Sequence, residues 1–317
     1  MERDESSPEP VSGLVLIAGS SNTDLVARTA RLPRAGETVA GSAFAVHAGG
    51  KGANQAVAAA RAGAQVVMLA AVGSDQHGAD RLEDLRAEGI DVRHVRVIDG
   101  EPSGVALIAV ADDGENFIVF VPGANDHVQA QQAIDVVRTL RPEVVGLCLE
   151  IPTPAVRATL ETAKEVDATS VLNVAPWNDT AHDLIPLASI VIANESETAE
   201  ALNLADFPDD PTDALQRLIA LGCTAAVITL GADGATYQDA NGNTGHVRPP
   251  KVTPVDTTGA GDAFCGTLCA WLAGGAPLAE AVRAGVAAGA LATTTHGAQP
   301  SFPTRSMIDA ARSRMSR

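Results

Sequence analysis

The sequence predicts an α/β protein with a doubly wound, mostly parallel sheet, helices on both faces of that sheet, and a small inserted β-sheet lid. First, short apolar segments of β-type composition alternate with Ala-rich segments of helical periodicity. Second, the β-type segments are continuously apolar, as expected of parallel strands that helices cover on both faces. Third, two stretches interrupt this alternation.

The predicted strands of the main sheet are residues 14–18, 66–72, 144–149, 170–174, 190–193 and 225–230. The predicted helices between them cover about 53–62, 76–88, 128–140, 153–166 and 211–221. A further β-type stretch, residues 252–255, precedes a C-terminal part, about 260–313, that is predicted to be mostly helical without another strand.

The two interrupting stretches, about 23–46 and 92–121, lack helical periodicity and alternate Val, Ile, Phe and Thr with polar residues and Gly. Residues 91–97, 104–110 and 116–121 have the pattern of antiparallel strands, and an Asp-Asp-Gly turn joins the last two. We interpret both stretches as a β lid inserted in the main domain. The alternative is that they extend the edge of the main sheet.

The chain of 317 residues is acidic, with 22 Lys+Arg against 39 Asp+Glu and a formal net charge of −17. Such a surface repels nucleic acid and anionic lipid, so we expect neither as a partner. A small anionic ligand would need local donors, such as backbone N–H groups, a helix N-terminus, a metal ion or a few cationic side chains.

One domain, residues 12–317, is predicted to follow a disordered leader over residues 1–11. Met1–Pro10 is acidic and rich in Pro and Ser, without the basic and apolar regions of a signal peptide. No apolar run reaches the roughly 18 residues of a membrane span, so we expect a cytoplasmic protein without a membrane partner. The four cysteines have neither CxxC spacing nor a neighbouring His pair, which indicates reduced packing residues and no zinc site.

The strongest local signal is Asp256-Thr-Thr-Gly-Ala-Gly-Asp262, which opens an Ala- and Leu-rich helix. Glycines at a helix mouth let the backbone approach a ligand, and the free N–H groups favour an anion. The run therefore predicts a phosphate cradle in which Asp262 accepts the proton of an attacking hydroxyl. The alternative is that Asp262 only caps the helix. Walker A and dinucleotide motifs do not fit, because the Lys-Ser/Thr of the first and the third Gly of the second are missing.

The second signal is Gly49-Gly-Lys-Gly-Ala-Asn-Gln55, where glycines again run into an Ala-rich helix. The flexible backbone would close over a polyhydroxyl ligand, and Asn54 offers a hydrogen-bond donor and acceptor together. Lys51 is one of only three lysines in the chain, so its position within a glycine run is notable. The alternative is a tight strand-to-helix turn with a solvated Lys51.

Together these two runs closely resemble the signature sequences of the ribokinase family of sugar and nucleoside kinases, and the resemblance extends over nearly the whole chain. Further matches occur in the order expected for that family. They are the sugar-binding Asn-x-Asp at Asn22 and Asp24, the pocket Glu at Glu150, the Asn-x-x-Glu motif at Asn194 and Glu197, the nucleotide-binding turn Thr229–Gly234, and the segment Gly297–Ser301.

The resemblance implies an ATP-dependent sugar kinase with Asp262 as its catalytic base. Gly259, Ala260 and Gly261 would offer N–H groups to the transferred phosphoryl group. The implied sugar site, between the main sheet and the lid, is Asn22, Asp24, Gly50, Lys51, Asn54, Glu150 and Asp262. The implied nucleotide site is Asn194, Thr229, Gly231, Gly234 and Gly261, with adenine between the turn at 229–234 and the helix around Val286.

The resemblance also implies two cations. Mg²⁺ would bridge the ATP phosphates, with Asn194 and Glu197 acting on it largely through water. An isolated Asn-x-x-Glu would more often be a helix start, and only the other motifs favour the metal. A K⁺-like ion would be held by Asp256, Thr258, Ala292, Thr295, Gly297 and Ser301.

The implied reaction is phosphorylation of the 5-hydroxyl of D-ribose. Kinases of deoxyribose, fructose or a nucleoside are alternatives within the family, and a non-catalytic sugar- or nucleotide-binding regulator is a remote one. A homodimer formed through the lid is also implied, because an exposed β lid has edges and an apolar face that need covering.

Overall fold

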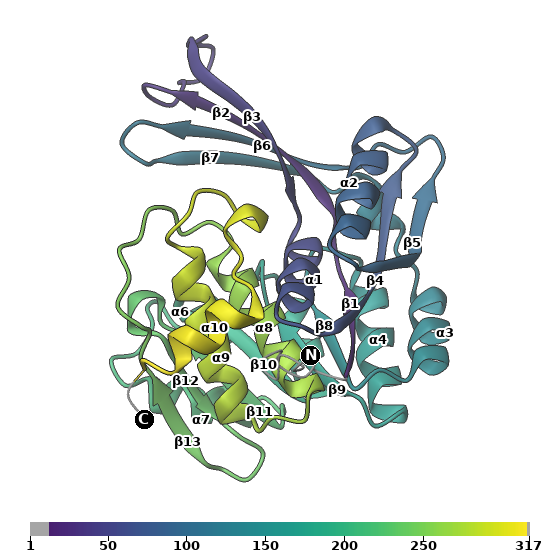
Figure 1. Cartoon of the computed structure of the whole chain (residues 1–317), viewed down its shortest axis with the longest axis vertical. Helices are drawn as coiled ribbons and strands as arrows, with labels where there is room; N and C mark the ends of the chain where they lie inside the picture. Colours follow the sequence, from purple (N-terminus) through teal and green to yellow (C-terminus); the bar gives the residue numbers. More distant parts are fainter. Residues whose placement is uncertain (1–12, 316–317) are drawn as a thin grey trace, which may run out of the picture.

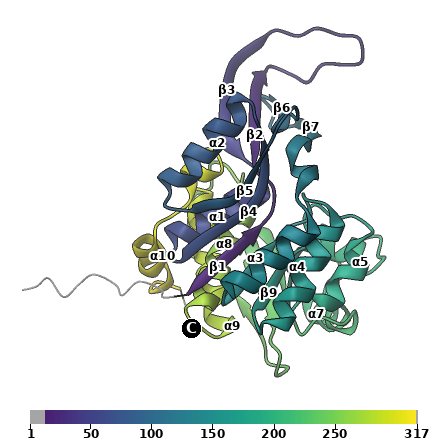
Figure 2. The same ribbon diagram turned by 90° about the vertical axis from the view of Figure 1, so that its right-hand side faces the viewer.

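The computed structural model describes residues 13–315, which form two sheets and the helices that cover the larger one (Figure 1). The larger sheet has nine strands in the order β13-β12-β11-β10-β9-β8-β1-β4-β5, and the smaller has four in the order β3-β2-β6-β7. Figures 1 and 2 show that the small sheet projects beyond the layered body. This confirms the predicted fold class, while the leader over residues 1–11 lies outside the described residues.

The strands of the large sheet are β1 (Leu14–Ala18), β4 (Gln65–Gly73), β5 (Asp91–Ile98), β8 (Val144–Leu147), β9 (Thr169–Asn173), β10 (Ile190–Asn194), β11 (Ala225–Thr229), β12 (Ala235–Gln238) and β13 (Thr244–Val247). Neighbours from β11 to β5 all pair in parallel, whereas β12 and β13 form an antiparallel hairpin at the edge. All six predicted main-sheet strands are present. The hairpin β12–β13 was not predicted, and residues 252–255 are not a strand.

The helices are α1 (Lys51–Arg61), α2 (Gln76–Ala87), α3 (Ala130–Leu140), α4 (Thr153–Glu165), α5 (Ala181–Leu184), α6 (Glu195–Ala201), α7 (Pro211–Ala220), α8 (Ala260–Ala273), α9 (Leu278–Ala292) and α10 (Arg305–Arg312). The short 3-10 helices are η1 (Gly123–His127), η2 (Ile185–Leu187), η3 (Gly231–Asp233) and η4 (Gln299–Ser301). No helix within residues 13–315 has both the length and the apolar run needed to cross a bilayer.

Two hydrophobic cores lie on opposite faces of the large sheet because side chains alternate along each strand. Val15 and Ile17 of β1 belong to the core formed with α1, α8, α9 and α10. Leu16 and Ala18 belong to the core formed with α3, α4 and α7. Figure 2 shows these two helix layers on either side of the sheet. The four free cysteines are all buried, as predicted, and burial raises the pKa of the Cys148 thiol to about 12.

The small sheet consists of β2 (Asn22–Thr29), β3 (Gly41–Gly49), β6 (Gly104–Ala111) and β7 (Asn116–Val121). β2 pairs antiparallel with β3 and parallel with β6, and β6 pairs antiparallel with β7. The prediction that residues 91–97 belong to the lid was wrong, because they form β5 and pair in parallel with β4. The connection from β4 through α2 to β5 is a crossover that returns a parallel strand to the same sheet. As an edge strand β5 is only partly buried, which explains its mixed polarity.

Close packing between α1 and α8 places the start of each helix beside the other. A Cβ atom added at Gly266 of α8 would lie 2.2 Å from the Gln55 carbonyl oxygen and 2.7 Å from the Ala58 Cβ. A glycine at this position therefore allows the backbones to approach more closely than any other residue would.

Gly266→Ala is expected to lower the free energy of unfolding by about 1–3 kcal/mol, the usual cost of overpacking, because α1 and α8 must move apart. The measurement is urea denaturation followed by circular dichroism. Gly261→Ala in the same helix is the matched control, since a Cβ there meets no atom within 4 Å. Equal stability of the two variants would show that the helix contact tolerates the methyl group.

Candidate active site

The candidate site lies where the small sheet joins the large one, at the carboxyl ends of the parallel strands (Figure 1). β1 leads directly into β2, and β3 leads into α1. At the root of the small sheet Asn22 pairs with Gly49 on one side and with Gly104 on the other. The lid strands and the start of α1 therefore meet at one place.

Asp262 is the third residue of α8, and its side chain points to α1. The N-cap of α8 is Gly259, with a left-handed φ of 77°. Asp262 is only 7% exposed, and its two carboxylate oxygens accept hydrogen bonds from Asn54 Nδ2 (2.9 Å) and Gln55 Nε2 (3.2 Å). The alternative that Asp262 only caps the helix is therefore wrong.

A buried chain of amides links Asp262 to the segment after α9. Asn54 donates to Asp262, and its Oδ1 accepts a hydrogen bond of 3.0 Å from Gln299 Nε2. Arg61, the last residue of α1, donates to the Gln299 carbonyl oxygen at 2.6 Å. Gln299 was not predicted as a site residue, although it lies within the motif Gly297–Ser301. The amide orientation of Asn54 is set by these two partners.

Glu150 and Lys51 meet at the N-terminus of α1. The Lys51 N–H donates to Glu150 Oε2 at 3.0 Å, and the Ser20 hydroxyl donates to the same oxygen. A carboxylate is stabilised there by the positive end of the helix dipole. Burial alone would lower the pKa of the Lys51 ammonium, but Asp262 and Glu150 outweigh it and raise that pKa. The glycine run is thus a tight strand-to-helix turn, with Gly50 as N-cap, but Lys51 is half-buried and not a fully solvated side chain.

Asp24 is a partly buried carboxylate at the base of the small sheet. Burial, and then the charge of Glu150, raise its pKa from 3.8 to about 6, against the opposing charge of Arg81. Arg81 is held behind β2, where its Nη1 donates to Thr23 Oγ1 at 2.7 Å. Asp24 therefore titrates near neutral pH, unlike an exposed carboxylate.

Asn22 is positioned by a residue that the sequence did not single out. Asn125 of η1 is fully buried, and its Nδ2 donates to Asn22 Oδ1 at 2.7 Å. Its own Oδ1 accepts from the Ser21 N–H at 3.0 Å. Because Asn22 Oδ1 already accepts this hydrogen bond, the Asn22 NH₂ group is the part of the side chain that can donate to a ligand. No motif marks Asn125, because only the return of the chain from β7 brings it here.

Asn194 and Glu197 form a capping box at the start of α6. Asn194 Oδ1 accepts from the Glu197 N–H at 2.8 Å, and Glu197 Oε2 accepts from the Asn194 N–H at 2.9 Å. Burial raises the pKa of Glu197 despite this bond and the charge of Lys51. Within residues 13–315 no cluster of three or more His, Cys, Asp or Glu side chains could hold a metal ion. A role with Mg²⁺ stays a prediction.

The nucleotide turn follows the strand next to Asn194. Asn194 and Thr229 are paired in the register of β10 and β11, so both lie at the same edge of the sheet. The turn closes with a bond of 2.8 Å from the Leu230 N–H to the Gly234 carbonyl oxygen, with Gly231 beginning η3 between them. Val286 belongs to α9, is only 5% exposed and packs in the core on that side of the sheet. The structure thus brings the turn and Asn194 together.

Asp256 ties the loop before α8 to the segment after α9. Its Oδ1 accepts from the Thr258 N–H (2.9 Å) and hydroxyl (2.6 Å), and its Oδ2 accepts from the Gly297 N–H (2.8 Å). Burial raises the pKa of Asp256, but these hydrogen bonds outweigh it and lower the pKa overall. Nearby, the Thr295 N–H lies 3.4 Å from the Ala292 carbonyl oxygen. Ser301 Oγ donates to the Ala298 carbonyl oxygen at 2.7 Å. A cation held by these residues stays a prediction.

The mouth of α8 has room for an anion beside Asp262. Gly261 is exposed, and a Cβ added to it would meet no atom within 4 Å. The first N–H groups of a helix lack intrahelical partners and are directed outward. The Asp262 carboxylate therefore lies at the mouth of α8, close enough to the Lys51 ammonium to raise its pKa. Beside it are the first N–H groups of the helix, of which the Ala260 N–H donates to the Thr257 carbonyl oxygen at 3.2 Å. This combination is suited to transfer of a phosphoryl group to a hydroxyl.

Comparison with known proteins gives a consistent result. The model of the pfkB family carbohydrate kinases matches residues 12–305. Ribokinase from Schizosaccharomyces pombe is 38% identical over 307 residues, which cover 93% of this chain and 96% of the relative. The structure of ribokinase from Giardia lamblia superposes with a TM-score of 0.87 at 28% identity, covering 95% and 98% of the two chains. That of Arabidopsis thaliana ribokinase complexed with ribose and ATP gives 0.86 at 27% identity, covering 96% and 98%.

Asp24→Asn is expected to stabilise the protein at pH 8 and to have little effect at pH 4. Because the folded-state pKa is raised to about 6, the contribution of Asp24 to stability is fully present below its unfolded pKa and is lost as pH rises through 6. Asparagine cannot ionise, so it removes this loss. The free energy of unfolding at pH 8 should then rise by up to about 3 kcal/mol, because the pKa of Asp24 is raised by about two units. The measurement is denaturant unfolding at both pH values. Asp112→Asn, in an exposed hairpin turn, is the control, and an equal gain from Asp24→Asn at pH 4 and pH 8 would contradict the assignment.

Proposed function

The chain belongs to the pfkB family of carbohydrate kinases, and on that premise we propose that it transfers the γ-phosphoryl group of ATP to the 5-hydroxyl of D-ribose. The observation that carries the proposal is the buried Asp262 at the mouth of α8, held by two amides of α1. The choice of ribose is supported by relatives named ribokinase that match over more than nine-tenths of both chains.

In the proposed reaction Asp262 accepts the proton of the sugar hydroxyl as its oxygen attacks the γ-phosphorus. The new O–P bond forms while the bond between the γ-phosphorus and the ADP oxygen breaks. Asn54 and Gln55 hold the carboxylate in one orientation, which a base needs to meet a single hydroxyl. The N–H groups of Gly259, Ala260 and Gly261 receive the charge that spreads over the phosphoryl oxygens, and Ala260 exchanges its bond of 3.2 Å to the Thr257 carbonyl oxygen for this contact. The Lys51 ammonium offsets the negative charge nearby.

The proposed sugar site combines one oriented donor with several acceptors. Asn22 presents its NH₂ group because Asn125 occupies its Oδ1. Asp24 and Glu150 accept hydrogen bonds from sugar hydroxyls, and the backbone at Gly50 lets the chain close on the ring. A site of this kind rejects an analogue that lacks a hydroxyl, because buried polar groups are then left without partners.

The nucleotide and the cations are placed by analogy with the family. Asn194, Thr229, Gly231 and Gly234 would bind ATP, and Asn194 with Glu197 would act on Mg²⁺ largely through water. Mg²⁺ bound to ATP neutralises phosphate charge. Asp256 and its neighbours would hold a K⁺-like ion and so keep the loop before α8 in shape. Adenine would pack against α9 near Val286.

A homodimer formed through the small sheet is part of the proposal. Cross-strand pairing places Phe44, Ala27, Ala109 and Phe117 in one row, so they share a face of the sheet. On that face Phe44 is 67% and Phe117 60% exposed. Leu107 and Val119, two residues along, share the same face and are also exposed. Asp24 lies on the opposite face, toward the site. An apolar face of this kind marks an association surface.

The substrate is tested by ADP release with ribose, 2-deoxyribose, fructose and adenosine as acceptors, in the presence of Mg²⁺ and K⁺. We expect the highest kcat/KM with ribose. A clear preference for another acceptor would replace ribose by that sugar or nucleoside, and no turnover with any of them would favour a non-catalytic binding protein.

Asp262→Asn is expected to lower kcat by about 10²- to 10⁴-fold while ATP binding is retained, because a general base contributes that much to proton transfer. The assay is steady-state turnover of ribose together with ATP binding by calorimetry. Asp99→Asn, at an exposed turn, is the control. A loss smaller than tenfold would remove Asp262 from the role of base.

The double variant Phe44→Asp/Phe117→Asp is expected to sediment as a monomer of 32.3 kDa, whereas the wild type sediments at twice that mass. Charges on the shared face would oppose burial of that face. Val97→Asp is the control, since Val97 is 52% exposed but belongs to β5 of the large sheet. A monomeric wild type, or a dimer that the double variant leaves intact, would rule out this interface.

A further inference from the structure

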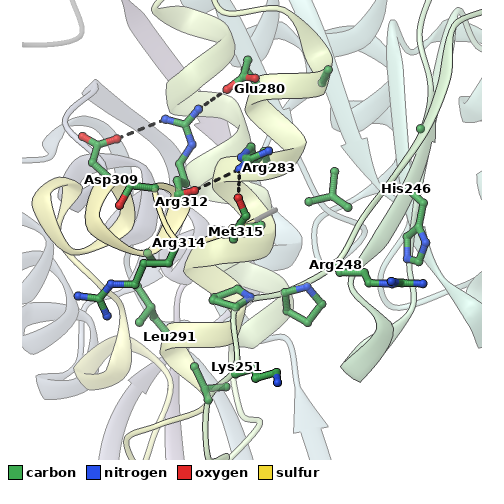
Figure 3. Close-up of a pocket in the computed structure, with 18 of the residues that line it drawn as sticks. His246, Arg248, Lys251, Glu280, Arg283, Leu291, Asp309, Arg312, Arg314 and Met315 are labelled. Carbon is green, nitrogen blue, oxygen red and sulfur yellow. Dashed lines mark hydrogen bonds and ion pairs between the residues drawn. The ribbon is translucent and has the colours of Figure 1, made fainter. Parts of the chain in front are cut away.

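A cavity of about 1670 Å³ lies away from the site described above (Figure 3). Its walls are β13 and the segment 248–252 on one side, and α9 with residues 311–315 at the end of α10 on the other. None of the residues assigned to the sugar, the nucleotide or the cations lines it. A cavity of this size exceeds the usual volume of small-molecule sites, so it has room for a metabolite.

The cavity is cationic in an otherwise acidic protein. Five of the chain's 22 Lys and Arg residues line it, against two acidic residues, in a chain of net charge −17. The lining charges are Arg248, Lys251, Arg283, Arg312 and Arg314, with Glu280 and Asp309. Figure 3 shows His246 and Arg248 on the β13 side, Arg283 near the centre and Arg314 on the opposite side.

The two acids do not neutralise this charge, because both already bind the same arginine. Arg312 forms ion pairs with Glu280 and with Asp309, the latter at 3.3 Å. Arg248, Lys251 and Arg314 make no ion pair with any residue in 13–315. Three cationic side chains without a counter-charge around one cavity attract an anion that carries several negative charges.

The cavity wall is connected to the nucleotide turn at one end and to the loop before α8 at the other. His246 Nε2 lies 2.7 Å from the carbonyl oxygen of Asp233 in the nucleotide turn. The Val247 carbonyl oxygen is 2.0 Å from where a Cβ of Gly234 would stand, so the turn and β13 are in close contact. In the other direction the segment 248–252 continues to Asp256, whose N–H donates to the Thr293 carbonyl oxygen at 3.1 Å. A ligand against this wall would therefore contact backbone that adjoins the nucleotide turn and continues into the loop before α8.

We propose that this cavity binds a small phosphate compound with two or more negative charges, and that its binding changes the affinity for ATP. Arg248 and Lys251 supply charge on the wall that reaches the nucleotide turn, and Arg314 supplies it on the opposite wall. The coupling requires only that the anion favours one position of the segment 248–252 over another.

The test uses inorganic pyrophosphate as the probe and the full-length protein. Calorimetry without Mg²⁺ measures pyrophosphate binding to the wild type and to Arg248→Glu/Lys251→Glu, where we expect affinity to fall at least about tenfold. The matched control is Arg86→Glu/Lys164→Glu, which changes the net charge equally at exposed positions outside the cavity and should change the affinity less than about twofold.

Three results would overturn the binding site: no binding at 10 mM pyrophosphate, equal weakening in both double variants, or binding that neither variant weakens, which would place pyrophosphate at the mouth of α8. In the second arm, pyrophosphate should shift the ATP Kd more in the wild type than in Arg248→Glu/Lys251→Glu, and an equal shift would overturn the coupling. Binding is measured without turnover, so a failure here is distinct from a failure of the proposed kinase activity.

Discussion

The close contact between α1 and α8 is the constraint on which the site depends. Asn54 and Gln55 reach Asp262 across 208 and 207 positions of sequence, and they do so because Gly266 lets the two helices approach. The start of each helix is fixed independently. Glu150 binds the first N–H of α1, and a Cβ at Gly259 would lie 2.8 Å from the Ala298 Cβ. The base is therefore held by the packing of rigid elements, which gives an active site its precision.

The carboxylates gathered at the site lower the free energy of unfolding of the protein. Asp262 and Glu150 raise the pKa of the Lys51 ammonium, whereas burial, Glu150 and Asp262 raise the pKa of Asp24. Ionised carboxylates that repel one another in a partly buried place are unfavourable for folding, but they provide the acceptors that a polyhydroxyl ligand requires. Such a conflict between stability and ligand binding is common at functional sites.

The small sheet has two faces with different roles, because the side chains of successive residues in a strand point to opposite faces. One face carries Asn22 and Asp24 at its root, toward the space above α1. The other carries Phe44 and Phe117 in one row. The face of Asp24 also carries the exposed side chains of Ile118 and Phe120. An association that covers the face with Phe44 and Phe117 would hold Asn22 and Asp24 over the site.

The sequence by itself determined the alternation of buried strands and helices, the helix mouths at Lys51 and Ala260, and the two glycine runs, because these depend on local periodicity and composition. Only the tertiary structure decided which distant side chains meet. β5 had the polarity of a lid strand but pairs with β4, since a crossover through α2 governs its place. Asn125 orients Asn22 without any local signal. Gln299 lies within the motif Gly297–Ser301, but nothing local indicates that it orients Asn54. Long-range hydrogen bonds form only when distant segments pack together, and no short segment of the sequence contains the information that determines this packing.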